Sequence, residues 1–232
     1  MGTLVSYQLE DSIATIAMDD GKVNALSLQM LTELNAALDR ASADRAVVVL
    51  TGRDGIFSAG FDLTVLRAGG SDASAMLRAG FELAERMLSF PTPVLIACTG
   101  HAVAMGVFLL LSGDYRVGAA GPYRITANEV AIGLTMPRAA VEICRQRLTP
   151  AHFNRAVIIS EVFSPEDAVA AGFLDRVVQA SELRETAVST AAVLAKLDMD
   201  AHAATKLRAR DHALHALRAA MQADDAGFQG TA

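Results

Sequence analysis

The chain has 232 residues, a formal net charge of −6 at pH 7, and a hydrophobic fraction of 52%. This composition indicates a globular protein with one large domain, or one domain and a small appendage. The acidic balance argues against a nucleic-acid partner, because a phosphate backbone requires a basic face. A small anionic ligand needs only a few local cations, such as Lys22, Arg53 or Arg67.

Three further features bear on the compartment. The N-terminal residues lack a basic region followed by an apolar block, so we expect no signal peptide. Cys98 and Cys144 lie in apolar surroundings without metal-type spacing, which favours structural thiols in a reducing, cytoplasmic setting and no metal site. The uncharged stretch 87–113 is long enough to span a membrane, but Pro91, Pro93 and the turn "TGH" favour two short buried elements instead.

The first part of the chain is typical of a β/α protein. Residues 4–10 and 12–18 read as two strands of a hairpin. After a polar loop, apolar residues recur at helical spacing from Met30 to Leu38, with Ser27 as a plausible N-cap. Residues 46–52, "AVVVLTG", predict a strand buried on both faces of a sheet.

The same order then repeats. We predict a helix over 73–90, a strand over 93–99, a buried helix over 102–112, and a short strand over 114–119. Residues 130–175 alternate short helices and turns, one of them with Ser164 as N-cap. The remainder, 182–222, reads as helix. The outline is a β/α core with a helical C-terminal part.

Three loops contain a glycine and lead from a strand into a helix. They are "FSAGFDL" (57–63), "TGHAVAMG" (99–106) and the approach to "NEVAIGL" (128–134). A helix start presents unpaired N–H groups and a positive dipole end, and two such starts facing one carbonyl would form an oxyanion hole. The alternative is that each glycine only lets the chain reverse. Neither a phosphate-binding loop nor a GxGxxG fingerprint is present.

Glu129 is the carboxylate that best fits a catalytic role. It precedes Val130, Ala131 and Ile132, so we expect an apolar setting that raises its pKa and suits a general base. An equally good interpretation is a Glu in the first turn of a helix capped by Asn128. The other acidic candidates, Asp62 and Asp114, stand at element boundaries where capping explains them, and His101 fits a partly buried structural histidine.

Taken together, these loops resemble the crotonase superfamily, the enoyl-CoA hydratases and isomerases, over residues 3–180. "FSAGFDL" looks like that family's FxAGxDL loop, and "PVLIACTGHAVAMGVFLLLSGDYRV" like its Gly-rich segment ending in D-x-R. "ANEVAIGLTMP" looks like its acidic segment, and "SPEDAVAAGFLDRVV" like its A-x-x-x-G-L-V-x-x-V tail.

The resemblance implies an α/β fold, a crotonase-like spiral of ββα turns (1–180) with a helical C-terminal segment (181–232), which serves oligomerisation and is shorter here. It implies a homotrimer, or a hexamer built as a dimer of trimers. The substrate would be an acyl-CoA thioester whose oxygen accepts bonds from the amides of Phe61 and Met105. No separate cofactor is implied, since coenzyme A enters with the substrate. The residues it assigns to substrate binding are Lys22, Val23, Asn24, Ala25, Ala59, Gly60, Asp62, Leu63, Gly106 and Phe108.

Hydratases of this family use two glutamates to activate water, and the resemblance places them at Phe108 and Glu129. With an apolar ring at the first position, the chain looks like the Δ3,Δ2-enoyl-CoA isomerases of fatty-acid metabolism, in which Glu129 would act as the single acid/base. A 2-enoyl-CoA hydratase and a catalytically impaired acyl-CoA-binding protein are the alternatives. The chain departs from the family pattern at Ala104 and Met105, where the family has a Gly-Gly pair.

Overall fold

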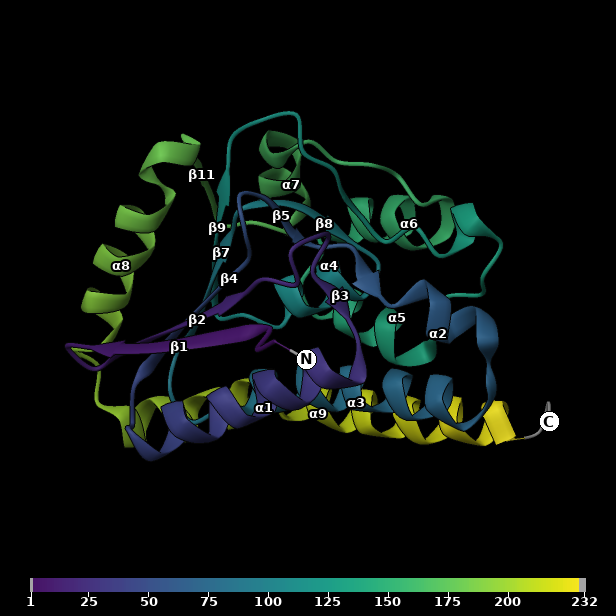
Figure 1. Ribbon diagram of the computed structural model, residues 1–232, viewed down its shortest axis with the longest axis horizontal. Helices are drawn as coiled ribbons and strands as arrows, with labels where there is room; N and C mark the ends of the chain where they lie inside the picture. The colour runs from purple at the N-terminus through teal and green to yellow at the C-terminus, as the bar shows by residue number, and fades with distance from the viewer. Residues whose placement is uncertain (1, 230–232) are drawn as a thin grey trace.

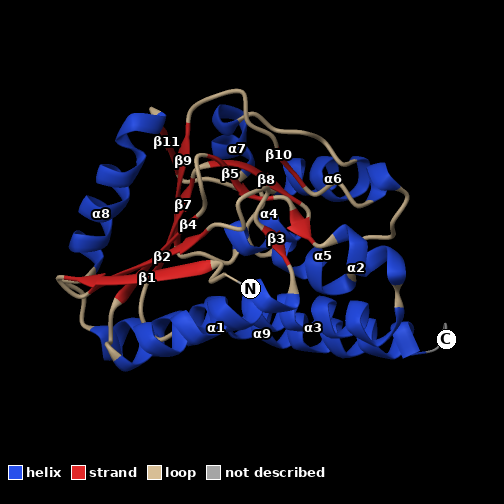
Figure 2. Ribbon diagram, viewed as in Figure 1, coloured by secondary structure: helices blue, strands red, loops and turns tan. Residues whose placement is uncertain are grey.

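The computed structural model describes residues 2–229, with side chains described up to residue 226. Figures 1 and 2 show a steep, twisted sheet with one helix on its outer face and a layer of long helices beneath. The described residues form a six-stranded sheet in the order β1-β2-β4-β7-β9-β11. Its strands are Val5–Glu10, Ile13–Met18, Val47–Thr51, Val94–Cys98, Tyr115–Ala119 and Arg176–Val178.

The N-terminal prediction is confirmed. β1 and β2 pair antiparallel as a hairpin, and β2 then pairs parallel with β4. The chain passes from β2 to β4 through α1 (Leu28–Ala43). Ser27 caps this helix, because its hydroxyl accepts a hydrogen bond from the Met30 amide at 3.2 Å. The rest of the sheet, from β4 through β7 and β9 to β11, is also parallel.

Both faces of the sheet are covered, which explains the uninterrupted apolar run of β4. Val47 and Val49 belong to a core cluster that includes residues of α8 (Leu183–Leu194), whereas Val48 and Leu50 belong to the main core. Because successive strand residues point to opposite faces, the four buried positions 47–50 of a strand covered on both sides are all apolar.

Two smaller sheets were not predicted. One has the order β10-β8-β5, built from Ile125–Thr126, Gly100–Val103 and Gly55–Ser58, and the other pairs β3 (Ala25–Leu26) with β6 (Gly60–Phe61). The predicted helix over 102–112 is therefore wrong at its start. Residues up to Val103 form β8, and α4 spans only Met105–Leu111. The backbone groups of β8 pair with neighbouring strands, which an apolar run cannot reveal.

The remaining helices largely follow the predicted positions. They are α2 (Leu63–Ala68), α3 (Gly70–Ser89), α5 (Arg138–Arg145), α6 (Pro150–Ile159) and α7 (Pro165–Ala171), with 3₁₀ turns η1 (Val130–Ile132) and η2 (Ala180–Glu182). The caps at Asp62 and Ser164 are confirmed, since their side chains accept hydrogen bonds from the amides of Thr64 and Asp167. α3 begins before the expected Ala73.

The C-terminal part contains two helices, where the sequence predicted one. α8 ends at Leu194, and α9 (Met199–Gln229) begins after a short break. α9 packs against α3 and α5 and runs along the base of the molecule in Figure 1. Among the described residues, no helix combines the length and hydrophobicity needed to cross a membrane.

Asp114 is not a helix cap, so that expectation is wrong. Its carboxylate accepts a hydrogen bond from the Val94 amide and forms ion pairs with Lys206 at 2.7 Å and Arg210 at 2.9 Å. Both cations come from α9, and the Lys206 side chain is only 4% exposed. This buried cluster attaches α9 to the sheet, across 92 residues of sequence.

The cluster predicts unequal effects of removing its partners. Asp114→Ala leaves Lys206 buried without a counter-charge, which costs about 3–5 kcal/mol. Lys206→Met leaves Asp114 paired with Arg210, so we expect less than half of that loss. Urea unfolding of both variants measures the difference, and equal losses would contradict the assignment of Asp114 as the common partner.

Candidate active site

The three glycine-containing loops leave the same edge of one small sheet. β8 lies between β5 and β10, and both pairings are parallel. The carboxyl ends of parallel strands meet at one edge, which is where open α/β sheets place their ligands. β5 leads into Ala59 and Gly60, β8 into Ala104 and Met105, and β10 toward Glu129.

The first two loops are in backbone contact. Gly60 has φ +90°, and a Cβ added there would lie 2.9 Å from the Ala104 Cβ and 3.1 Å from the Met105 amide nitrogen. A Cβ on Gly106 would lie 2.4 Å from the Ser58 carbonyl oxygen. Only glycine permits this approach at both positions. The loops that carry Phe61 and Met105, the predicted oxyanion donors, are therefore adjacent.

Ala104 holds a backbone conformation that favours glycine. Its φ of 50° and ψ of −126° match the first central residue of a type II′ turn. Its amide donates to the Thr126 carbonyl at 3.0 Å, which ties this turn to β10. The turn that resembles the family's Gly-Gly pair therefore keeps a glycine-like conformation despite its side chain, and Met105 becomes the first residue of α4.

The predicted binding loop from Lys22 to Ala25 lies against the first of these loops. The Ala59 amide donates to the Val23 carbonyl at 3.0 Å, and β3 pairs Ala25 with Gly60. Asn24 is fully buried, with its side-chain amide donating to the carbonyl oxygens of Met18 and Phe57. Val23 is exposed, and Asp62 and Leu63 continue from β6 into the start of α2.

Glu129 is a buried carboxyl group with an unsatisfied oxygen. It is 7% exposed, and its Oε2 has no hydrogen-bond partner among the described residues. Burial raises the pKa of this carboxyl to about 7, because a low-dielectric setting disfavours the charged form. The predicted direction and its cause, burial, are both right. The neighbours from which the burial was expected are themselves exposed, since Val130 and Ile132 are 44% and 51% exposed.

The alternative interpretation, in which Glu129 starts a helix capped by Asn128, is right in one part and wrong in the other. Glu129 directly precedes the 3₁₀ turn η1, but the Asn128 side chain provides no cap. The side-chain oxygen of Asn128 is also buried without a partner, so it caps no amide among the described residues. Buried polar groups in proteins are usually hydrogen-bonded, and an exception requires an explanation. Two adjacent unsatisfied acceptors are consistent with a site that a bound molecule completes.

Phe108 lies one helical turn after Met105 and is almost fully buried. Its ring stacks on Phe81 of α3 at 6.3 Å, and Phe81 in turn meets Phe61 edge to face at 6.2 Å. Phe81 was missed by the sequence analysis. On the sequence it is one more apolar residue of a helix, and only the packing shows that its ring joins two predicted site residues.

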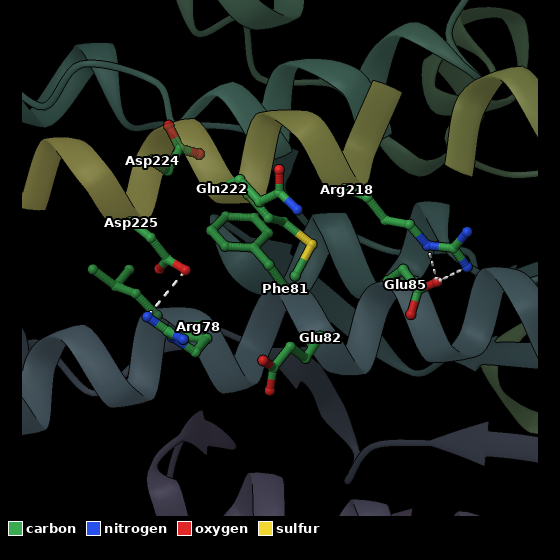
Figure 3. Close-up of a pocket in the computed structure, with 10 residues that line it drawn as sticks. Arg78, Phe81, Glu82, Glu85, Arg218, Gln222, Asp224 and Asp225 are labelled. Carbon is green, nitrogen blue, oxygen red and sulfur yellow. Dashed lines mark hydrogen bonds and ion pairs between the residues drawn. The ribbon is translucent and has the colours of Figure 1, made fainter. Parts of the chain in front are cut away.

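A cleft opens on the other side of Phe81, between α3 and α9 (Figure 3). It has a volume of about 220 Å³ and none of the predicted site residues lines it. Its lining residues are Leu77, Arg78, Phe81, Glu82, Glu85, Arg218, Met221, Gln222, Asp224 and Asp225. In the part of the chain that the structure describes, the cleft included, no cluster of three His, Cys, Asp or Glu side chains could hold a metal ion.

Comparisons with known proteins agree with this geometry. The family model "Enoyl-CoA hydratase/isomerase" matches residues 8–232. A human protein named "Enoyl-CoA delta isomerase 1, mitochondrial" is 31% identical, with 82% of this chain and 64% of the human protein covered. A Mycobacterium avium protein named "Probable enoyl-CoA hydratase echA17" is 29% identical, with coverage of 94% and 79%.

A solved structure of an enoyl-CoA isomerase from Mycobacterium tuberculosis superposes with a TM-score of 0.94 at 51% identity, covering 97% of this chain and 99% of that one. The predicted crotonase-like α/β fold and the predicted family are confirmed. The relatives carry both isomerase and hydratase names, so the reaction itself has to be argued from the site.

The burial of Glu129 predicts a pH-dependent stability difference. Its folded pKa of about 7 lies above the unfolded value of 4.5, so the native state holds the proton more tightly, and ionisation costs stability as pH rises between these values. The full cost is about 3 kcal/mol. Glu129→Gln removes this titration, so its stability relative to wild type should rise from pH 4.5 to pH 7 and then level off. The check is the free energy of urea unfolding of both proteins as a function of pH. If the two curves run parallel, the pKa of Glu129 is not raised by burial.

Proposed function

Because the chain belongs to the enoyl-CoA hydratase/isomerase family, we propose that it shifts the double bond of a 3-enoyl-CoA to give the 2-enoyl-CoA. The observation that carries this proposal is one buried carboxyl, Glu129, which follows the strand β10 at the edge from which the Phe61 and Met105 loops also leave. The family resemblance places the second carboxyl of the hydratases at Phe108, which has none. A double-bond shift requires one acid/base group, whereas water addition in this family uses two.

In the proposed reaction, the Glu129 carboxylate removes a proton from C2 of the substrate. The electron pair moves into a dienolate, whose oxygen accepts hydrogen bonds from the amides of Phe61 and Met105. Glu129 then returns the proton at C4, which leaves the double bond between C2 and C3. A pKa near 7 serves both steps, because the group must accept and donate at neutral pH. Each oxyanion donor is typically worth ~3 kcal/mol of barrier.

Phe108 argues against the hydratase alternative on physical grounds. Its buried ring stacks on Phe81 and offers no acceptor that could orient a water molecule. The retained Glu129 argues against a protein that only binds acyl-CoA, because an unpartnered carboxyl in an apolar site costs stability without helping to hold a thioester.

Coenzyme A would bind along the loop from Lys22 to Ala25 and the segment Ala59–Leu63. Two cations stand beside these backbones, the exposed Lys22 and the half-buried Arg53, whose guanidinium donates to the Lys22 carbonyl at 3.2 Å and also pairs with Asp19 at 3.6 Å. Such cations suit the phosphates of the nucleotide end. The acyl end would then lie against Gly60 and Gly106, between the two oxyanion loops. Because Cys98 and Cys144 are free thiols, we propose a reducing, cytoplasmic location.

We also propose that the chain assembles as a homotrimer or a dimer of trimers. Exposed apolar side chains gather on η1 and on the end of α6, two segments linked by a hydrogen bond from the Ala131 amide to the Ser160 hydroxyl. These side chains are Val130, Ile132, Leu134, Ile158, Ile159 and Val162. An exposed apolar patch of this kind beside the Glu129 loop is typical of a subunit interface. Sedimentation velocity measures the oligomeric state, and a monomer would contradict the proposed assembly.

A parallel assay separates the three functions. Purified protein receives a 3-enoyl-CoA and a 2-enoyl-CoA, each with Glu129→Gln as control. We expect conversion of the 3-enoyl substrate only, a loss of about 10²–10⁴-fold in the variant, and kcat/KM that rises with pH through about 7, because the free enzyme needs the carboxylate. Water addition to the 2-enoyl thioester by wild type but not by the variant would establish a hydratase, and binding without either reaction would establish a binding protein.

A further inference from the structure

We propose that Phe81 determines the acyl-chain length that this protein accepts, by separating the active site from the cleft between α3 and α9. The proposal rests on the proposed function, since it concerns the fatty tail of the same substrate. No residue of this cleft belongs to the predicted site.

Phe81 stands directly behind both oxyanion loops. The preceding residue, Gly80, lies against them: a Cβ added there would be 2.4 Å from the Phe61 ring and 3.5 Å from the Met105 Cε. Phe81 itself contacts the rings of Phe61 and Phe108. An acyl tail that extends past these two rings therefore meets the Phe81 ring.

The other side of the same ring faces the cleft. Phe81 lines the cleft together with the apolar side chains of Leu77 and Met221, and Figure 3 shows its ring pointing from α3 toward α9. Phe81 is only 5% exposed, so its ring is almost completely covered by these neighbours. One aromatic ring is thus shared by the wall of the site and the wall of the cleft.

The cleft has an apolar part in which an alkyl chain can lie, formed by Leu77, Phe81 and Met221, whereas its seven other lining residues are charged or polar. Ion pairs join α3 to α9 at two points, Arg78 to Asp225 at 3.0 Å and Glu85 to Arg218 at 2.6 Å (Figure 3). They tie the two helices together on either side of the apolar side chains of Leu77, Phe81 and Met221. With the Phe81 ring in place, short acyl chains fit the site and long ones are rejected. Without it, a long tail has about 220 Å³ of additional space to enter.

The test compares cis-3-hexenoyl-CoA with cis-3-dodecenoyl-CoA as substrates of wild type, Phe81→Ala and Phe81→Leu. We expect the ratio of kcat/KM for the long over the short substrate to increase about tenfold or more in Phe81→Ala, the scale on which pockets discriminate hydrocarbon size. Phe81→Leu, which disturbs packing less, should fall between wild type and Phe81→Ala.

Leu83→Ala is the matched control. Leu83 is a buried residue of the same helix and lines a different internal space, next to Ile16 and Leu34. Its truncation loosens the packing of α3 but leaves the Phe81 ring between the site and the cleft. The ratio of kcat/KM for the long over the short substrate should therefore remain at the wild-type value. In the Phe81→Ala background, Leu77→Trp fills the cleft and should return the ratio toward wild type.

Binding separates failure of this proposal from failure of the proposed function. The Kd values of hexanoyl-CoA and dodecanoyl-CoA, measured by calorimetry on the same variants, need no reaction. If wild type isomerises neither substrate, the proposed function is wrong, and the change in the Kd ratio still decides the role of Phe81. If the long-over-short ratio of kcat/KM and that of Kd are the same in the Phe81 variants as in Leu83→Ala, Phe81 does not determine chain length.

Discussion

The candidate site depends on the parallel hydrogen bonding of β8 with β5 on one side and β10 on the other. This pairing brings three segments, separated by up to 70 residues of sequence, to one edge. Gly60 and Gly106 then allow the backbones to approach until no Cβ would fit. In the proposed mechanism, two amides and one carboxyl act on a single thioester, and these short strands fix their positions before any ligand arrives.

A second constraint comes from α9. The Asp114 cluster attaches this helix to the large sheet, and Asp224 near its other end accepts hydrogen bonds from the amides of Arg138 and Ala139 at the start of α5. α5 follows the Glu129 loop and carries Cys144, whose pKa burial and the nearby Glu129 both raise. Through α5 this helix is therefore connected to the loop that carries Glu129, and it also forms one wall of the cleft beyond Phe81.

The elements that the sequence predicts are those with long, regular patterns. The hairpin, α1 and β4 have enough residues for alternation or helical spacing to be visible. β8 is four residues long and continues into an apolar helix, so its start reads as helix, and the two-residue strands β6 and β10 carry no pattern. Asp114 reads as a cap because its cationic partners are far away in the sequence, Lys206 by 92 residues. The burial of Glu129 was expected from its neighbours, yet Val130 and Ile132 are exposed and the burial comes from the fold.

The most direct test of the central claim is a crystal structure with a non-reactive acyl-CoA thioester. The account predicts that the thioester oxygen lies about 2.7–3.1 Å from the amide nitrogens of both Phe61 and Met105, with the Glu129 carboxyl facing C2. A thioester held in the cleft between α3 and α9, or an oxygen that contacts neither amide, would contradict it.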